Sequence, residues 1–223
     1  MNPLKIAAIG AHPDDIELSM AGLMLRFANA GHDTSWIIAT DGAAGNGGRD
    51  ATLASVRAAE AEAAACCAGA RLIQCGFPDG QIAWDHTAPA IIAQHLALLK
   101  PDLIVTHALN DYHPDHRTVA RIVGDTAPLN TPILRADNML GLHFLPDFLV
   151  DIGDVFDAKL AALAMHESQK MSTFREAITT WNRFRGLQSG KQKFSHAEAY
   201  TIDRQPSNEL RPLLDRIGGY VML

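Results

Sequence analysis

Residues 4–15 read LKIAAIGAHPDD, and this stretch decides the fold. Its apolar run, Leu4–Ile9, ends at Gly10 and has the length and composition of a buried strand. A histidine and two carboxylates follow directly. A dinucleotide-binding turn would carry Gly-x-Gly-x-x-Gly at this point, and adjacent acids would repel a pyrophosphate. We therefore expect a buried strand that ends in polar side chains and does not bind a nucleotide.

Strand and helix patterns alternate along the first half of the chain. Short apolar runs predict further strands at Thr34–Ala39, Leu72–Cys75 and Leu103–Thr106. The apolar spacing between them predicts helices over residues 16–30, 51–68, 88–99 and 114–123. Continuous apolar strands separated by helices are typical of parallel sheets that are covered on both faces. We expect an α/β, Rossmann-like, doubly wound fold with a mostly parallel sheet.

The second half is less regular but continues the same fold. It predicts strands at residues 148–152 and 197–202 and helices at residues 155–165 and 174–184. No linker, repeat or low-complexity tract interrupts the chain, so we expect residues 1–223 to form a single domain. The tail, residues 206–223, is expected to pack on it.

Composition excludes several classes of protein. The chain has 19 Lys+Arg against 25 Asp+Glu and no basic run, which argues against a nucleic-acid surface. Its 48% hydrophobic content is too high for a disordered chain. Three cysteines cannot build a disulfide framework, and Cys66 and Cys67 are predicted to be core residues. With no signal peptide and no membrane span in this sequence, we expect a cytoplasmic protein.

Two polar clusters follow the first and fourth predicted strands. They are His12-Pro13-Asp14-Asp15 and, about 100 residues later, Asp111-Tyr112-His113-Pro114-Asp115-His116. In a doubly wound sheet these two strands are neighbours, and ligands bind at the carboxyl ends where the strand order reverses. We therefore expect the two clusters to face each other.

Histidines and a carboxylate in this arrangement suit a divalent transition metal. Catalytic zinc sites use three protein ligands and leave the fourth position to water, and His12, Asp15 and His116 can supply three. The same donors also suit Fe(II), Mn or Co. Paired acids before a helix can instead be simple N-caps.

The remaining members of the clusters suit catalysis. Asp14 is placed to act as a general base on a water molecule beside the metal. His113, supported by Asp115, can stay protonated and donate to an oxyanion or leaving group. His107 is expected beside the ligands, and His143 and His166 could reach the pocket from later loops.

The paired motifs resemble those of the LmbE-like (PIG-L) family of zinc-dependent N-deacetylases. The similarity extends over most of the chain and includes Thr40–Gly42, Arg57-x-x-Glu60, Phe77–Gly80, Lys159, His166-x-Ser168-Gln169 and Glu198–Tyr200. One departure is Ser19-Met20-Ala21, where many members have Gly-x-Gly-Gly.

The resemblance also implies residue roles. It implies zinc held by His12, Asp15 and His116, Asp14 as general base, and His113 held by Asp115 as acid partner. It implies that Arg57 and Asp79 contact the substrate. Two alternatives stay open: Arg57 pairs with Glu60 or forms an inward ion pair, and Asp79 serves only its turn.

The expected activity is hydrolysis of an N-acetyl group on an amino-sugar (N-acetylglucosamine-type) conjugate by metal-activated water. One alternative is a hydratase that adds water to an unsaturated small carboxylic acid, and another is a metal-binding module without catalysis. We expect a small-molecule partner, no nucleic acid and no membrane, and leave a homo-oligomer open. Specificity is expected from loops at residues 42–50, 137–147 and 167–173.

Overall fold

One mixed sheet of eight strands organises the protein. The computed structural model describes residues 2–138, 143–204 and 210–223. The strand order is β3-β2-β1-β4-β5-β7-β6-β8. The first five of these pair in parallel: β3 (Arg71–Phe77), β2 (Asp33–Thr40), β1 (Lys5–Gly10), β4 (Leu103–His107) and β5 (Ile133–Ala136). The order reverses at β1, as expected for a doubly wound sheet.

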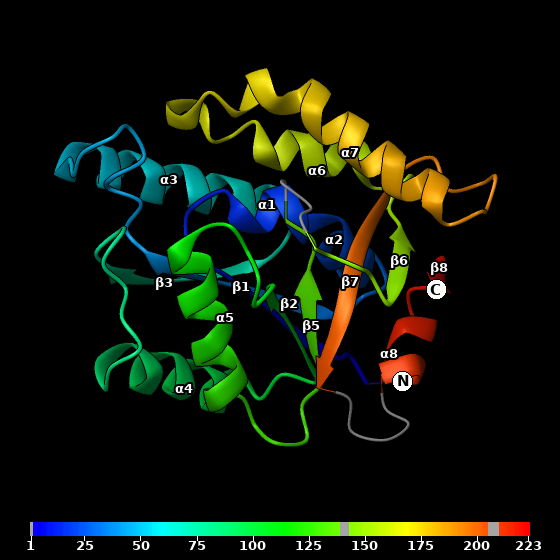
Figure 1. Ribbon diagram of the computed structural model, residues 1–223, viewed down its shortest axis with the longest axis horizontal. Helices are drawn as coiled ribbons and strands as arrows, with labels where there is room; N and C mark the ends of the chain where they lie inside the picture. The colour runs from blue at the N-terminus through cyan, green and yellow to red at the C-terminus, as the bar shows by residue number, and fades with distance from the viewer. Residues whose placement is uncertain (1, 139–142, 205–209) are drawn as a thin grey trace.

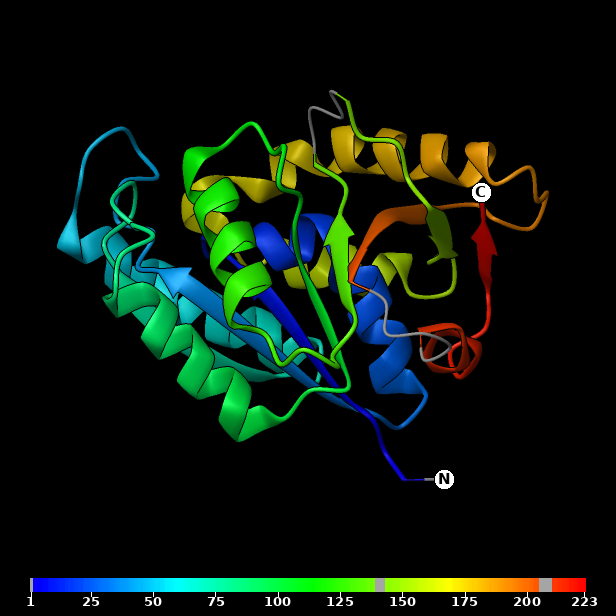
Figure 2. The same ribbon diagram turned by 60° about the horizontal axis from the view of Figure 1, so that its bottom comes forward.

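The last three strands complete the sheet in antiparallel pairing. β7 (Ala197–Arg204) lies between β5 and β6 (Phe148–Asp151), and β8 (Tyr220–Met222) pairs with the outer side of β6. Figure 2 shows β8 at the edge of the sheet, beyond β6. The predicted α/β class is confirmed, with a mostly parallel sheet.

Helices cover both faces of the sheet (Figure 1). One face carries α1 (Asp15–Ser19), α2 (Ala21–Asn29), α3 (Ala51–Cys67), α6 (Phe156–Leu163) and α7 (Arg175–Gln188). The other carries α4 (Thr87–Leu99) and α5 (Pro114–Thr126). Two 3-10 turns, Glu167–Gln169 and Met171–Phe174, connect α6 to α7, and α8 (Leu210–Asp215) precedes β8. Each face has its own apolar core, with alternate side chains of β1 contributing to one or the other.

The prediction of one helix over residues 16–30 is wrong, because the structure divides this segment at Met20 into α1 and α2. The Glu198 carboxylate accepts hydrogen bonds from the backbone N–H groups of Gly22 and Leu23, each at 2.8 Å, and so starts α2 as a separate helix. The buried Lys159 ammonium donates to the same carboxylate at 2.7 Å. These contacts fix the start of α2 against β7.

The predicted burial of Cys66 and Cys67 in the core is wrong. Cys66 and Cys67 are exposed at the end of α3, because the alanines of that helix already fill the space against the core. No run in the sequence predicted β5, α8 or β8, since each is too short to show a period. Within the ranges given above, no helix is long and apolar enough to cross a membrane.

Candidate metal and catalytic site

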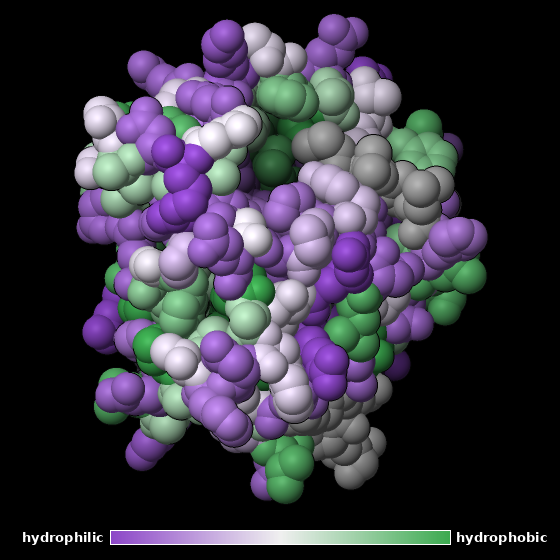
Figure 3. Space-filling view, turned by 60° about the vertical axis from the view of Figure 1, so that its left-hand side comes forward, coloured by the Kyte–Doolittle hydropathy of each residue, from purple (hydrophilic) through white to green (hydrophobic). Residues whose placement is uncertain are grey.

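Four loops at the carboxyl ends of β1 to β4 surround a cavity of about 490 Å³. Figure 3 looks onto this end of the sheet and shows a hollow with hydrophobic and hydrophilic side chains around it. The two polar clusters predicted to face each other do so here. The polar lining of the cavity comes mainly from His12, Asp14, Asp15, Arg57, Asp79, His113 and His116. Its apolar lining comes from Leu18, Met171 and Phe174 with the ring of Tyr112.

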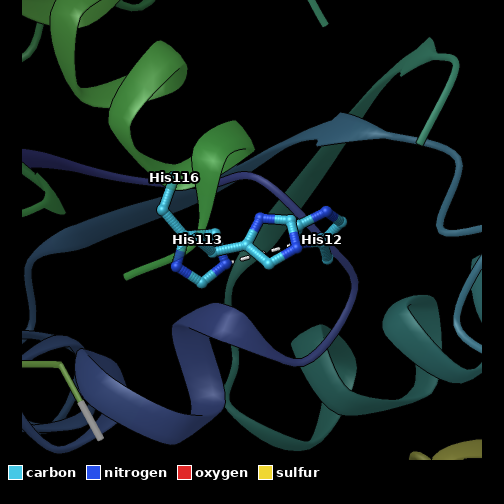
Figure 4. A group of neighbouring side chains, drawn as sticks. All are labelled: His12, His113 and His116. Carbon is cyan, nitrogen blue, oxygen red and sulfur yellow. Dashed lines mark hydrogen bonds between the residues drawn. The ribbon is translucent and has the colours of Figure 1, made fainter. Parts of the chain in front are cut away.

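The three predicted metal ligands converge at one point. His12 Nδ1 lies 3.2 Å from His116 Nε2, and the Asp15 carboxylate oxygens lie 3.4 Å from the first nitrogen and 3.1 Å from the second. Neighbouring ligands of a tetrahedral zinc with bonds of about 2.0–2.1 Å are ~3.3 Å apart. Figure 4 shows the rings of His12, His113 and His116 gathered together, with a dashed line joining His12 to His116. The donor set therefore fits a tetrahedral metal.

Asp15 is held in its charged form. Burial would raise its pKa, but His116 and His107 beside it hold the pKa well below its usual value. His107 Nε2 lies 3.2 Å from Asp15 Oδ2 and accepts the N–H of Ala11 at 2.9 Å. His107 is thus found next to the ligand, as the sequence predicted, and it restrains the loop after β1.

Asp14 lies beside these ligands and contacts Arg57. Its Oδ2 accepts a hydrogen bond from Arg57 Nη2 at 3.1 Å, and no side-chain bond from Asp14 caps α1. Burial and the neighbouring Asp15 charge raise the pKa of Asp14 to about 7, against the opposing effect of Arg57. Asp14 also has a positive φ of 110°, which few residues with a side chain adopt.

Arg57 forms the inward ion pair that the sequence left as an alternative. Its side chain is only 3% exposed, and it donates to the carbonyl oxygens of Pro13 and Gly42 as well as to Asp14. Glu60 instead accepts two hydrogen bonds of 2.7 Å from Ser168. Arg57 thus ties the loops after β1 and β2 together.

Asp115 lies against His12 and not against His113. Its Oδ2 is 3.2 Å from His12 Nε2 and accepts the N–H of Gly80 at 2.8 Å. His113 caps α5, where its Nδ1 accepts the N–H of Asp115 at 3.2 Å. Burial and the nearby His12 and His116 lower the pKa of His113. A neutral His113 ring bonded in this way carries its proton on Nε2.

Asp79 lies on the same side of His12. Its Oδ1 is 3.1 Å from His12 Nε2, and its Oδ2 accepts the N–H of Ala44 at 2.9 Å. The Asp79 N–H itself donates to Asp41 Oδ1 at 3.1 Å, so the carboxylate is fixed from both ends of its loop.

The structure also places residues of these motifs and later loops whose roles the sequence left open. Asp111 Oδ1 lies 3.1 Å from His116 Nδ1, a contact that the motif contained but whose role was not assigned. His166 lies fully buried beneath α1, where its Nε2 is 2.7 Å from Glu17 Oε1. His143 lies away from the cavity, beside Asn110. Part of the predicted specificity loop at residues 137–147 lies outside the described residues.

Comparison with known proteins identifies the family of this chain. Residues 7–127 match the PIG-L family, described as GlcNAc-PI de-N-acetylase. A diacetylchitobiose deacetylase of Thermococcus kodakarensis is 26% identical over 186 residues, which cover 74% of this chain and 70% of that protein.

Solved structures share the fold. A 4-carboxy-2-hydroxymuconate hydratase, GalB of Pseudomonas putida, superposes with a TM-score of 0.82 at 19% identity, over 92% of this chain and 98% of that one. An N,N'-diacetylchitobiose deacetylase of Pyrococcus horikoshii superposes with a TM-score of 0.76 at 20% identity, over 90% of this chain and 84% of that one.

The histidine–carboxylate cluster lies at the switch point of an α/β fold, where such enzymes bind their ligands. The family match and the deacetylase relative define the class as an amide-hydrolysing enzyme. The family match covers more than half of the chain, so the protein belongs to the PIG-L family of N-deacetylases, which hydrolyse amide bonds.

Proposed function

We propose that this protein removes an N-acetyl group from an amino-sugar conjugate of the N-acetylglucosamine type, with zinc as its metal. The observation that carries the proposal is the convergence of His12 Nδ1, Asp15 and His116 Nε2 at tetrahedral spacing, with the Asp14 carboxylate on the adjacent residue. The relative that deacetylates diacetylchitobiose supports this substrate class.

The residues of this chain divide the chemistry among them. The metal, when bound, polarises the acetyl carbonyl and lowers the pKa of a water molecule. Asp14 accepts a proton from the attacking water, and Arg57 holds its carboxylate in place. His113 donates a hydrogen bond from Nε2–H to the developing oxyanion. The proton that Asp14 takes from the water then passes to the departing nitrogen as the C–N bond breaks. The products are the free amine and acetate.

The charge of the cavity favours this reaction over the hydratase alternative. Carboxylates in or beside the cavity outnumber guanidinium groups. The carboxylates belong to Asp14, Asp15, Asp79, Asp111 and Asp115. Arg57 is already paired with Asp14, and Arg49, on the loop after β2, is paired with Asp41. A substrate with several carboxylates would meet repulsion here, whereas an N-acetylated sugar is neutral.

Two assays on the same purified protein test the proposal. Metal analysis should find zinc, and incubation with N-acetylglucosamine, diacetylchitobiose and larger conjugates should release acetate. Loss of an enoate ultraviolet band with no acetate from any acetylated sugar would support the hydratase instead. Bound metal with neither activity would indicate a non-catalytic metal-binding module.

A further inference from the structure

Two carboxylates from different loops meet at the same nitrogen of His12. Nε2 lies 3.1 Å from Asp79 Oδ1 and 3.2 Å from Asp115 Oδ2, while Nδ1 faces Asp15 and His116. We propose that Asp79 and Asp115 are positioning residues that keep the His12 proton on Nε2, which leaves the Nδ1 lone pair free for the metal. This inference rests on the metal centre of the proposed function.

Both carboxylates are held in place by the protein itself. Asp79 accepts the N–H of Ala44 at 2.9 Å, and Asp115 accepts the N–H of Gly80 at 2.8 Å. Their exposed fractions are only 7% and 3%. The backbone N–H bonds to Asp79 Oδ2 and Asp115 Oδ2 therefore orient both carboxylates without a contribution from the substrate. Asp79 also lines the cavity, so its contact with the substrate stays a prediction, whereas the carboxylate of Asp115 is hydrogen-bonded to His12 and not to His113.

The second histidine ligand also has a carboxylate near its other ring nitrogen, although the geometry of this contact is not that of a hydrogen bond. His116 directs Nε2 toward the ligand cluster, and its Nδ1 lies 3.1 Å from Asp111 Oδ1. Metal-binding histidines ordinarily donate their other N–H to a carboxylate or carbonyl, which fixes the tautomer and the ring orientation. His12 differs in having two such carboxylates, supplied by the loops after β3 and β4. Its orientation therefore depends on three loops at once.

The test is zinc affinity, measured by competition with a chromogenic chelator at fixed pH. Asp79→Ala/Asp115→Ala should weaken zinc binding by about 10–100-fold, the usual effect of losing such partners. Asp79→Asn/Asp115→Asn should lose less zinc affinity, because the amide oxygens can still accept a hydrogen bond from His12 Nε2–H. The control is Asp33→Ala/Asp157→Ala, which removes two exposed acids elsewhere and should stay within about twofold of wild type, since distant surface charges are screened.

The outcomes separate this inference from the proposed function. Suppose that Asp79→Ala/Asp115→Ala binds zinc as tightly as the control variant and raises only the KM for the acetylated substrate. Asp79 and Asp115 would then be substrate contacts, and the inference would be overturned. A wild-type protein that binds no zinc would remove the metal centre and this inference together. If the alanine pair fails to fold, as monitored by thermal unfolding, each single variant should still weaken zinc binding measurably, and unchanged affinity in both would overturn the inference.

Discussion

Asp14 combines an unusual backbone conformation with the proposed general-base role. Asparagine tolerates a positive φ and can still accept from Arg57, so Asp14→Asn preserves the local structure while removing the basic carboxylate. We predict that kcat for acetate release falls by about 10²–10⁴-fold while the zinc content is unchanged. Near wild-type turnover in this variant would exclude Asp14 as the base.

His116 is predicted to be essential for retaining the metal. His116→Ala removes one of three protein ligands, so zinc should fall from about one equivalent per chain to a small fraction after dialysis. Elemental analysis gives the measurement. His86→Ala is the matched control, because His86 is exposed at the start of α4 and should keep a full complement of zinc. Equal zinc loss in both variants would count against the assignment.

The sequence predicted which residues gather but not all of their contacts. His12, Asp15 and His116 could be placed because topology alone brings the ends of β1 and β4 together. The direction of the Asp115 carboxylate could not be predicted, because it depends on the N–H of Gly80, which another loop supplies. The paired-motif spacing carries no information about that third loop.

At the scale of elements, the start of α2 is closely packed against β7 and the residues that follow β6. A Cβ on Gly22 would lie 2.5 Å from Ile152 Cγ2 and 2.9 Å from the Glu198 carboxylate carbon. Overpacking in Gly22→Ala costs about 1–3 kcal/mol, and the higher helix propensity of alanine offsets ~1 kcal/mol of this cost. Because the nearest contact is as short as 2.5 Å, we predict that the free energy of unfolding falls by about 1–2 kcal/mol.

Chemical denaturation of the variant provides the measurement. Gly48→Ala is the matched control, since a Cβ there would meet nothing within 4 Å, and its stability should be unchanged or slightly raised. A Gly22→Ala protein as stable as wild type would show that α2 can shift without cost. The helical pattern over residues 16–30 gave no sign of this site, because the carboxylate that binds the first N–H groups of α2 comes from a strand about 175 residues later.

At the scale of the whole molecule, the acidic cavity and the net charge of −6 act together on charged substrates. We predict that N-acetylglucosamine 6-phosphate is deacetylated with a kcat/KM about tenfold below that of N-acetylglucosamine at low salt, since like charges repel. The gap should narrow as ionic strength rises to physiological values, where the Debye length falls to about 8 Å. Comparing both substrates across a salt series tests this. A preference for the phosphate would contradict the charge argument.

The parallel half of the sheet could be predicted from sequence, and the antiparallel half only in part. Strands β1 to β4 each show a continuous apolar run followed by a helix. In contrast, β5 and β8 have four and three residues, and the position of β7 between β5 and β6 is set by pairing between distant segments. No local pattern encodes such a pairing order.

The late position of β7 in the chain has a consequence for synthesis. Until residues 197–204 leave the ribosome, β6 has no bridge to the parallel strands, and Glu198 is not there to anchor α2. The α2 helix is made early, but the carboxylate that anchors its first residues is made about 175 residues later. The contact between α2 and β7 can therefore form only after the helices and parallel strands between them have been synthesised.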